Sequence, residues 1–381
     1  MGILSKIIAL VTAATMLTGV NPGEAGSKLD EYIAAQETAN SGAITSPVDP
    51  VELCGRITVG WNLGNSLDAT GSGMSSETSW GNPKTTRELI LKVKEAGFDA
   101  VRIPTTWYNH LDSDFNISEE WLARVQEVVD YAYDEGMYVI LNVHHENWND
   151  PYESTLPDVK KKIKKLWTQI ANRFESYGER LIFEGMNEPR WKNTEFEWNG
   201  GNAEGRRVVN AYNECFVETV RATGGNNRYR ALMIPTYAAS SSGLDGFTVP
   251  QDKSLIVSVH AYSPYNFAMN PSGTTKFDPN NTSDTQELTL LAGTLYDRFI
   301  SKGTGVIIGE CGTANKNNYS DRVNWAGYFP KLFRSKGIPV FLWDNNAYGS
   351  GNETFGQLHR DTLAWEYPEY IKAFVKAAKQ K

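Results

Sequence analysis

The sequence contains little cysteine. Its 381 residues include three cysteines, Cys54, Cys215 and Cys311, and their spacing is not that of a metal-binding motif. Such an odd, small number allows at most one bridge. The sequence therefore indicates neither a disulfide framework nor a structural zinc site.

An excess of positive charge is also lacking. The formal net charge is -8 and the isoelectric point is near 5.3, whereas proteins that bind phosphate-rich polymers gather Lys and Arg. A basic run at residues 160–165 lies in an expected helix whose apolar residues share a single face. We interpret this run as a solvated outer surface, so no nucleic-acid partner is expected.

The apolar run near the start of the sequence is too short to span a bilayer as a stable helix. Residues 7–17 are apolar, follow Lys6 and precede small residues around Ala25, which is the pattern of a secretion signal. We predict a signal peptide over residues 1–25 and a secreted, extracellular protein with no membrane partner after processing. A plain N-terminal helix is the alternative. Residues 26–50 are typical of a linker or disordered N-terminal arm, and residues 51–381 are predicted to form one domain.

No glycine-rich phosphate loop follows any of the expected strands, which removes the main reason to predict a nucleotide-binding fold. Instead, short β-branched strands alternate with amphipathic helices. The strands are apolar enough for burial on both faces, as parallel sheets require. Eight strand–helix units fit a single closed (β/α)8 TIM barrel in the α/β class better than an open sheet. The expected strands are 57–62, 99–104, 137–145, 181–187, 231–235, 254–262, 305–310 and 338–344.

Helical periodicity and capping signals predict a helix after most of these strands. The first helix begins with a capping box at residues 85–88 and ends at Gly97. Pro330 interrupts the helix pattern after the seventh strand, so a kink or break is expected there. The helix after the fifth strand is the least distinct. The expected helices include 85–96, 118–135, a lysine-rich helix ended by Gly178, a helix through Val208 and Val220, 286–301, 320–335 and 361–378.

Carboxylates stand at the ends of two expected strands. Glu188 follows the strand over residues 181–187, and Glu310 ends the strand over residues 305–310. In such a barrel the carboxyl ends of all strands open into one mouth, where the fourth and seventh strands face each other. Cleavage of a glycosidic bond needs two facing carboxylates, one to donate a proton and one to attack or to activate water. The plainer alternative is that each Glu is an exposed loop residue or a salt-bridge partner.

Polar and aromatic residues at the other strand ends give these carboxylates suitable neighbours. Arg102 can hold Glu310 ionised by charge and hydrogen bonds. A partly enclosed Glu188 beside a second carboxylate should have a raised pKa, as a proton donor requires. Asn187 can bind a sugar hydroxyl. The remaining candidates are His260 and Tyr262, which can orient the carboxylates, and Trp343, on which a flat sugar ring can stack.

Seven short motifs carry these residues in barrel order, and with them the chain from about residue 51 to 378 resembles glycoside hydrolase family 5, a retaining family. Within that family the sequence is similar to the endo-β-1,4-glucanases of anaerobic plant-degrading microbes. The motifs are Gly60-Trp-Asn-Leu-Gly-Asn65, Val101-Arg-Ile-Pro104, Val143-His-His-Glu146, Met186-Asn-Glu-Pro189, His260-Ala-Tyr262, Ile308-Gly-Glu310 and Leu342-Trp343.

The resemblance implies a role for each matching residue. Glu188 would be the acid/base and Glu310 the nucleophile. It implies an enzyme that cuts internal bonds of a β-glucan polysaccharide. Separately, we expect a monomer that needs no cofactor or metal. The supporting residues would be Arg102, His144, Asn187, His260, Tyr262 and Trp343, and more branch-specific sugar contacts would come from Asn62, Trp80, His145 and Trp148. We expect an open cleft lined by Trp61, Trp80, Trp148 and Trp343.

Three alternatives stay open. The run His144-His-Glu146, together with His260, could supply metal ligands, as in metal-dependent barrel hydrolases, although no Asp or Lys completes such a site. A sugar-binding barrel without catalysis would lack one carboxylate, and both carboxylates are present. The same chemistry on xyloglucan, mixed-linkage glucan, xylan or mannan is the nearest rival, because the choice among these substrates depends on loop contacts.

Overall fold

The computed structural model describes residues 42–380 of the chain. The expected signal peptide and most of the expected N-terminal arm lie outside the described residues. Within the described range, no helix combines the length and the apolar character that crossing a membrane requires.

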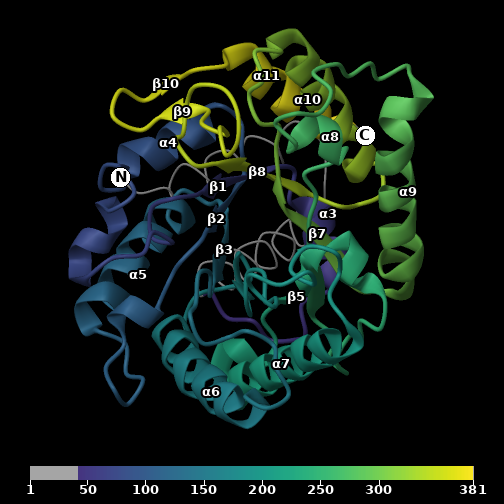
Figure 1. Cartoon of the computed structure of the whole chain (residues 1–381). Helices are drawn as coiled ribbons and strands as arrows, with labels where there is room; N and C mark the ends of the chain where they lie inside the picture. The colour runs from purple at the N-terminus through teal and green to yellow at the C-terminus, as the bar shows by residue number, and fades with distance from the viewer. Residues whose placement is uncertain (1–41, 381) are drawn as a thin grey trace, which may run out of the picture. The chain divides into compact units, whose positions relative to one another are not determined.

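Eight strands close into a barrel in the order of the sequence, so the expected TIM barrel is confirmed. All neighbouring strands are parallel, and Trp61 of the first strand pairs with Val101 of the second strand and with Leu342 of the eighth. Figure 1 shows the strands at the centre and the helices around them. The strands are β1 (Gly60–Leu63), β2 (Ala100–Ile103), β3 (Tyr138–Asn142), β4 (Leu181–Glu184), β5 (Leu232–Ser240), β6 (Leu255–His260), β7 (Gly305–Cys311) and β8 (Val340–Asp344).

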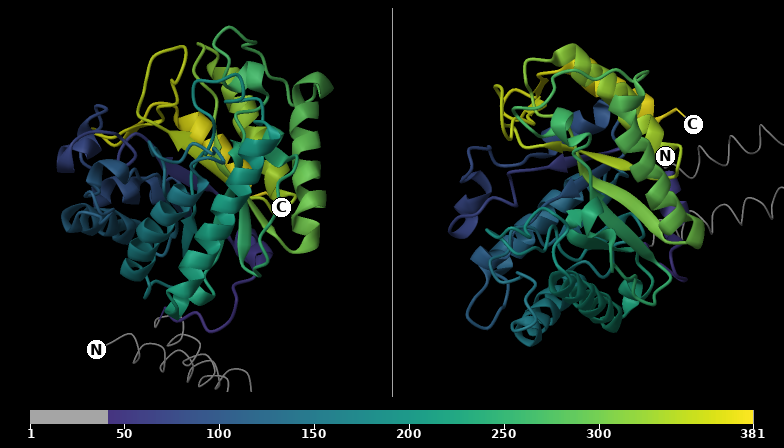
Figure 2. Two further views of the ribbon diagram at one scale, coloured as in Figure 1. Left: turned by 60° about the horizontal axis from the view of Figure 1, so that its bottom comes forward. Right: turned by 45° about the vertical axis from the view of Figure 1, so that its right-hand side comes forward.

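Amphipathic helices cover the outside of the barrel and run alongside the strands (Figure 2). In the lysine-rich helix, Ile163 and Trp167 are buried against the barrel while Lys161 and Lys164 are exposed, which confirms the solvated face. The main helices are α4 (Arg87–Glu95), α5 (Glu119–Tyr133), α6 (Leu156–Arg173), α7 (Ala203–Ala222), α9 (Thr282–Arg298), α10 (Tyr319–Arg334) and α11 (Pro368–Ala378). Shorter elements are α8 (Tyr265–Ala268), η1 (Gly73–Thr78), η2 (Tyr108–His110), η3 (Gly225–Arg228), η4 (Ser241–Leu244) and η5 (Ile300–Lys302).

The amino-terminal end of the barrel is closed by a helix that the sequence analysis did not predict, α3 (Pro50–Arg56). The Asp49 side chain caps it by accepting hydrogen bonds from two backbone N–H groups of the first turn. Leu53 packs into the apolar floor of the barrel, and Ile44 and Val48 belong to the same cluster. The packed domain therefore begins before the expected boundary at residue 51.

The structure contradicts one helix expectation and removes the break, though not the kink, that was expected in another. The long strand β5 is followed by the short turn η4 and not by a full helix. The helix α10 continues through Pro330 without a break. Trp325 and Phe329 of this helix stack on each other, and Trp325 also stacks on Tyr370 and Phe374 of α11. This packing stabilises the helix although Pro330 supplies no backbone N–H.

The last helix also begins later than expected, at Pro368 and not near residue 361. The preceding residues form a small antiparallel hairpin of β9 (Leu358–His359) and β10 (Ala364–Trp365). The buried carboxylate of Asp344 accepts hydrogen bonds from the backbone N–H groups of Gln357 and Leu358. This tie to the end of β8 holds the segment in an extended form.

The three cysteines are free and buried, so Cys54 and Cys215 do not pair. The thiol of Cys311, directly after Glu310, lies 3.4 Å from the backbone oxygen of Phe341 and packs in the core. These residues therefore behave as small apolar side chains.

Candidate active site

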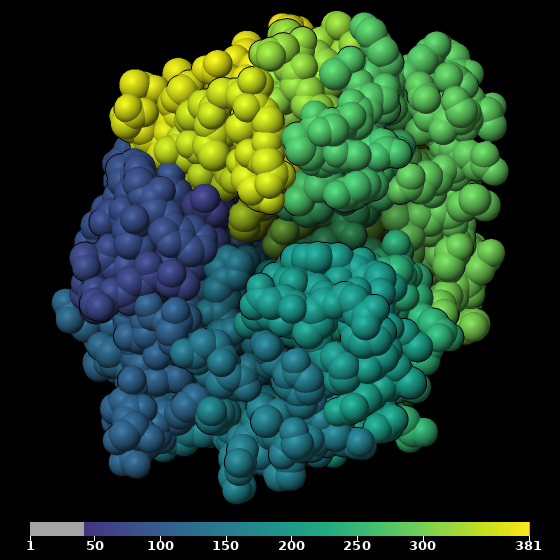
Figure 3. Space-filling view, in the orientation of Figure 1, coloured from purple at the N-terminus to yellow at the C-terminus, as the bar shows by residue number. Residues whose placement is uncertain are grey.

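The predicted site residues gather at the carboxyl ends of the strands. Figure 3 shows a hollow in the middle of one face of the domain, between teal, green and yellow segments that follow the strands. Arg102 comes from β2, His260 from β6, Glu310 from β7 and Trp343 from β8, while Glu188 follows β4. Rigid strands therefore hold most of these groups, and no long loop has to order them.

Glu310 is 5% exposed and both of its oxygens are engaged. Its Oε1 accepts a hydrogen bond of 2.8 Å from Arg102 Nη1, and its Oε2 accepts one of 2.9 Å from the Tyr262 hydroxyl. Burial and the Glu310 charge raise the pKa of Tyr262 well above its ordinary value. The phenol consequently stays a hydrogen-bond donor, and Glu310 is held in one orientation beside a positive charge.

Glu188 has a different partner, because its Oε1 lies 2.7 Å from His260 Nδ1. Burial by itself would raise the pKa of Glu188, but the hydrogen bond and charge of His260 and the nearby Arg190 outweigh it and lower the pKa to about 2. Burial likewise opposes a charged His260, yet the charges of Glu310 and Glu188 raise the His260 pKa. The expected upward shift of Glu188 is therefore wrong here: the proton lies on His260, one hydrogen bond away.

The two carboxylates are close to each other. One oxygen of Glu188, one oxygen of Glu310 and a ring nitrogen of His260 all lie within 4.8 Å of one another. His260 Nδ1 is 3.6 Å from Glu310 Oε2, so the imidazole lies between the two acids. The barrel mouth therefore holds two adjacent carboxylates and, between them, an imidazole that shares a proton with Glu188.

Arg102 is fully buried and connects several of the predicted residues. Besides Glu310, its Nη1 donates to Asn62 Oδ1 at 3.0 Å, and its Nη2 donates to Asn187 Oδ1 at 2.7 Å. Burial would lower the pKa of Arg102, but the charges of Glu184 and Glu310 raise it. Because the Asn187 oxygen is engaged, the amide N–H groups of Asn187 are left to face a substrate.

Glu184, in β4, is a site residue that the sequence analysis missed. Its side chain is fully buried and accepts hydrogen bonds from Arg102 Nε at 2.7 Å, Asn142 Nδ2 at 3.1 Å and Ser258 Oγ at 2.7 Å. The signal was present, because a charged residue directly follows the apolar run Leu181–Phe183 in a strand expected to be buried on both faces.

His144 has a fixed proton position. The backbone N–H of Thr105 donates to Asn142 Oδ1 at 3.0 Å, so the Asn142 amide nitrogen faces His144 Nδ1, also at 3.0 Å. Nδ1 must then accept, and the ring proton lies on Nε2. Burial, together with the charges of His145 and Arg102, lowers the pKa of His144 well below its ordinary value, so the ring is neutral.

Two groups of described residues could in principle hold a metal ion: Asp68 with His144 and His145, and Glu188 with His260 and Glu310. A histidine binds a metal through a nitrogen lone pair. In the first group Nε2 of His144 carries the proton, and in the second group Nδ1 of His260 is hydrogen-bonded to Glu188. Neither set of ligands is arranged for a cation, which argues against the metal-dependent alternative.

Aromatic rings line part of the mouth. Trp343 stacks nearly parallel to His144, with ring centroids 6.0 Å apart and planes 3° apart. Trp80 is 42% exposed and packs against His145 at 5.6 Å. Trp148 is half-buried, and its indole N–H donates to Glu146. These residues can offer ring faces to a sugar chain.

Two of the predicted sugar contacts are too deep to reach a substrate. Asn62 is fully buried, and its amide donates to Gly309 O at 3.0 Å while its oxygen accepts from Arg102. Trp61 is also fully buried and donates to Asp344 Oδ2 at 3.1 Å. Adjacent residues of a strand point to opposite sides. The structure therefore assigns Asn62 to the support of Arg102 and Trp61 to the core.

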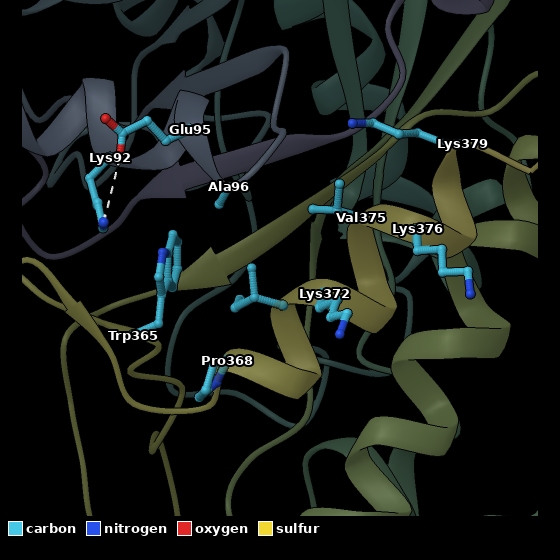
Figure 4. Close-up of a pocket in the computed structure, with 10 residues that line it drawn as sticks. Lys92, Glu95, Ala96, Trp365, Pro368, Lys372, Val375, Lys376 and Lys379 are labelled. Atoms are coloured by element: carbon cyan, nitrogen blue, oxygen red, sulfur yellow. Dashed lines mark hydrogen bonds and ion pairs between the residues drawn. The ribbon is translucent and has the colours of Figure 1, made fainter.

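A separate groove lies on the outer helices, between α4 and α11 (Figure 4). Its floor includes Ala96, Trp365 and Val375. The carboxylate on its rim, Glu95, lies 3.5 Å from Lys92. Since the residues that line it include no second carboxylate, this groove cannot supply the paired acids found at the barrel mouth.

A (β/α)8 barrel with two close carboxylates at its mouth, Glu310 buried and Glu188 partly buried, is the arrangement of a glycoside hydrolase. The family model for cellulase, glycosyl hydrolase family 5, matches residues 67–349. The chain belongs to this family, and the protein is a glycoside hydrolase.

Relatives of this chain include endoglucanases from anaerobic microbes. Endoglucanase B of Neocallimastix patriciarum is 46% identical over 85% of this chain and 71% of the relative, and Endoglucanase A of Ruminococcus albus is 46% identical over 92% of this chain and 98% of the relative. A solved GH5-4 broad specificity endoglucanase from Ruminococcus champanellensis, with bound cellotriose, is 48% identical, has a TM-score of 0.82 and covers 86% of this chain and 98% of its own.

Proposed function

We propose that the protein is a secreted endo-β-1,4-glucanase that cleaves internal bonds with retention of configuration. In this proposal Glu188 is the acid/base and Glu310 is the nucleophile. The observation that carries the proposal is the separation of at most 4.8 Å between an oxygen of Glu188 and one of Glu310. Retaining enzymes place their carboxyl groups roughly 5–5.5 Å apart, whereas inverting enzymes leave about 6.5–9.5 Å for a water molecule.

In the first step, a Glu310 oxygen attacks the anomeric carbon while the bond to the leaving oxygen breaks. The proton held on His260 passes to Glu188 and from there to the leaving oxygen. As Glu310 becomes a glycosyl ester it loses its charge, so the pull of Arg102 on that carboxylate weakens. Tyr262 and Asn187 supply hydrogen bonds beside the reacting carbon.

In the second step, Glu188 takes a proton from a water molecule, and the water oxygen bonds to the anomeric carbon. The ester bond to Glu310 breaks, and the returning charge is again stabilised by Arg102 and Tyr262, which lie 2.8 Å and 2.9 Å from the two oxygens. Because both steps invert the anomeric centre, the product keeps the original configuration.

The substrate class follows from the relatives and from the aromatic rings at the mouth. The cellotriose in the R. champanellensis structure is a β-1,4-glucan fragment, and that enzyme is described as having broad specificity. Xyloglucan, mixed-linkage glucan, xylan and mannan therefore belong in the same assay. We expect a cellulose derivative to lose viscosity well before reducing ends accumulate. A fall in viscosity only in step with released glucose or cellobiose would contradict internal cutting.

The two carboxylates can be told apart by azide rescue. Removing either should lower turnover by several orders of magnitude, about 10³-fold or more. Glu188→Ala should still react with an activated aryl glycoside, and azide should give a β-configured glycosyl azide. Glu310→Gly should give the α-configured product. A fluorosugar trap should label Glu310 in the unmutated enzyme, and a label on Glu188, or an inverted product, would overturn the assignment.

Secretion and the monomeric state are separate parts of the proposal. The leader pattern of residues 1–25 motivates cleavage before about residue 28. We expect the intact mass of the secreted protein to lack residues 7–17, and we expect light scattering to give the mass of one chain. A mature protein that keeps residues 7–17 would contradict the leader assignment.

A further inference from the structure

Glu184 is a fully buried carboxylate of β4 that shares Arg102 with the proposed nucleophile, Glu310. It receives hydrogen bonds from the three strands β2, β3 and β6 through Arg102, Asn142 and Ser258. Burying a carboxylate is costly unless its charge is paired and its oxygens are satisfied. Here both conditions hold, because Arg102 supplies the opposite charge and the two Glu184 oxygens together accept three hydrogen bonds.

The charge of Arg102 is shared between two carboxylates. Its Nε donates to Glu184 at 2.7 Å and its Nη1 donates to Glu310 at 2.8 Å, on different edges of one guanidinium group. A guanidinium carries one positive charge over a rigid plane. Each carboxylate therefore weakens the hold of Arg102 on the other.

We propose that Glu184 is a positioning residue with two effects. It weakens the electrostatic attraction of Arg102 for Glu310, and it holds the Arg102 guanidinium group in one orientation. This inference rests on the proposed role of Glu310 as nucleophile. A nucleophile must give up its negative charge in the first step and regain it in the second. Sharing Arg102 keeps Glu310 from being stabilised so strongly that attack on the sugar becomes slow.

Glu184→Gln isolates the charge, because the hydrogen bonds can persist. The amide oxygen can face Arg102 and Asn142, and the amide nitrogen can donate to the Ser258 hydroxyl, which accepts as well as donates. With Arg102 no longer shared, the first step should slow and the second step should speed up, each by about tenfold. A loosened site would slow both steps, so the opposite signs distinguish charge from structure.

Both half-reactions can be measured with a 2-fluoro-β-cellobioside that carries an activated leaving group. The rate of inactivation reports the first step, and the rate of reactivation of the trapped enzyme reports the second. Asp252→Asn is the matched control. Asp252 accepts two hydrogen bonds from Arg221, at 2.7 Å and 2.9 Å, so it is also a carboxylate paired with an arginine. It precedes β6 and therefore lies at the amino-terminal end of the barrel, away from the site. Both rates should stay within about twofold of the parent in this control.

The outcomes separate this inference from the proposed function. If the fluorosugar does not label Glu310 in the parent enzyme, the proposed function fails. If it labels Glu310 but Glu184→Gln slows reactivation or leaves it unchanged, the role of Glu184 is refuted. Should the Gln variant not fold, Ser258→Ala tests the same charge, because removing the hydroxyl leaves more of the Glu184 charge on Arg102. Reactivation should then slow, and an unchanged or faster rate would refute the role.

Discussion

The two ends of the barrel are built from the same eight strands but differ in chemistry. At the amino-terminal end, side chains such as Leu53, Ile140, Ile182 and Ile256 form an apolar cluster under the helix α3. At the carboxyl end, Arg102 and Glu184 are equally buried, yet they form a connected set of ions and hydrogen bonds. Burial alone therefore does not tell which end is functional. Arg230, next to the start of β5, is also fully buried but donates to backbone carbonyls, whereas Arg102 is paired with two carboxylates.

The difference has an energetic consequence. Apolar burial stabilises the folded chain by about 25 cal/mol per Å² removed from water. A buried ion pair gives little net stability, because desolvation offsets most of the attraction. The closed end therefore supplies stability, and the polar end gives up stability in order to hold charges in one arrangement. The following substitutions test this division, from the largest expected effect to the smallest.

Arg102→Lys should be the most damaging change at the polar end. One ammonium group cannot reach Glu184, Glu310 and Asn187 together as the guanidinium fork does. We expect kcat/KM to fall by about 100-fold or more, with a lower melting temperature. Arg221→Lys, which alters a similar pair with Asp252 at the other end, should keep activity within about threefold. Activity of Arg102→Lys within tenfold of the parent would contradict the assignment.

Leu53→Ala should show the reverse pattern. The side chain is fully buried in the apolar floor, so its truncation should lower the free energy of unfolding by about 2–5 kcal/mol. At temperatures well below unfolding, kcat should change little, because no group at the mouth moves. Denaturant unfolding and steady-state kinetics on one preparation check both statements. A large loss of kcat with unchanged stability would show that the two ends are not separable.

His260→Asn should alter the dependence of stability on pH. The raised His260 pKa means that its contribution is full below the ordinary value of 6.5 and is lost as the pH rises through the raised value. The lowered Glu188 pKa means that its contribution is full above 4.5 and is lost as the pH falls toward about 2. The gap in melting temperature between parent and variant should therefore be widest between pH 4.5 and 6.5.

The same variant should move the alkaline limb of kcat/KM toward lower pH. The transferable proton then has to lie on Glu188 alone, without the imidazole that holds it in the parent at 2.7 Å. A pH–rate profile with an unmoved alkaline limb would show that His260 does not hold that proton.

Gly309→Ala should have the smallest effect. A Cβ atom there would come within 3.1 Å of both His260 Nε2 and Ser258 Oγ, so both groups would have to shift by a few tenths of an ångström. We expect kcat to fall by about two- to fivefold. Gly327→Ala, where no atom lies within 4 Å of the added Cβ, is the control and should leave kcat unchanged. Equal effects in the two variants would remove the argument for close packing behind His260.

The barrel was predictable because local signals agreed with it. The β-branched run before Glu310 and the capped helix after Thr86 both appear in the structure close to their expected positions. The departures arose where distant contacts override local pattern. Pro330 stays inside α10 because the helix packs on α11, and residues 358–365 form a hairpin because Asp344 binds the backbone at Gln357 and Leu358.

By itself, the sequence determined which strands carry Glu188, Glu310, Arg102 and His260, because strand periodicity and the order of strand ends are local properties. Only the tertiary structure decided what these groups do to one another. The pairing of Glu188 with His260 and the sharing of Arg102 with Glu184 depend on distances of 2.7 Å between side chains from different strands or strand ends. The proton position on His144 depends on the Thr105 backbone N–H, after β2, which donates to Asn142 at 3.0 Å. Electrostatic and hydrogen-bond energies change steeply over such distances, so a residue pattern along one strand cannot determine them.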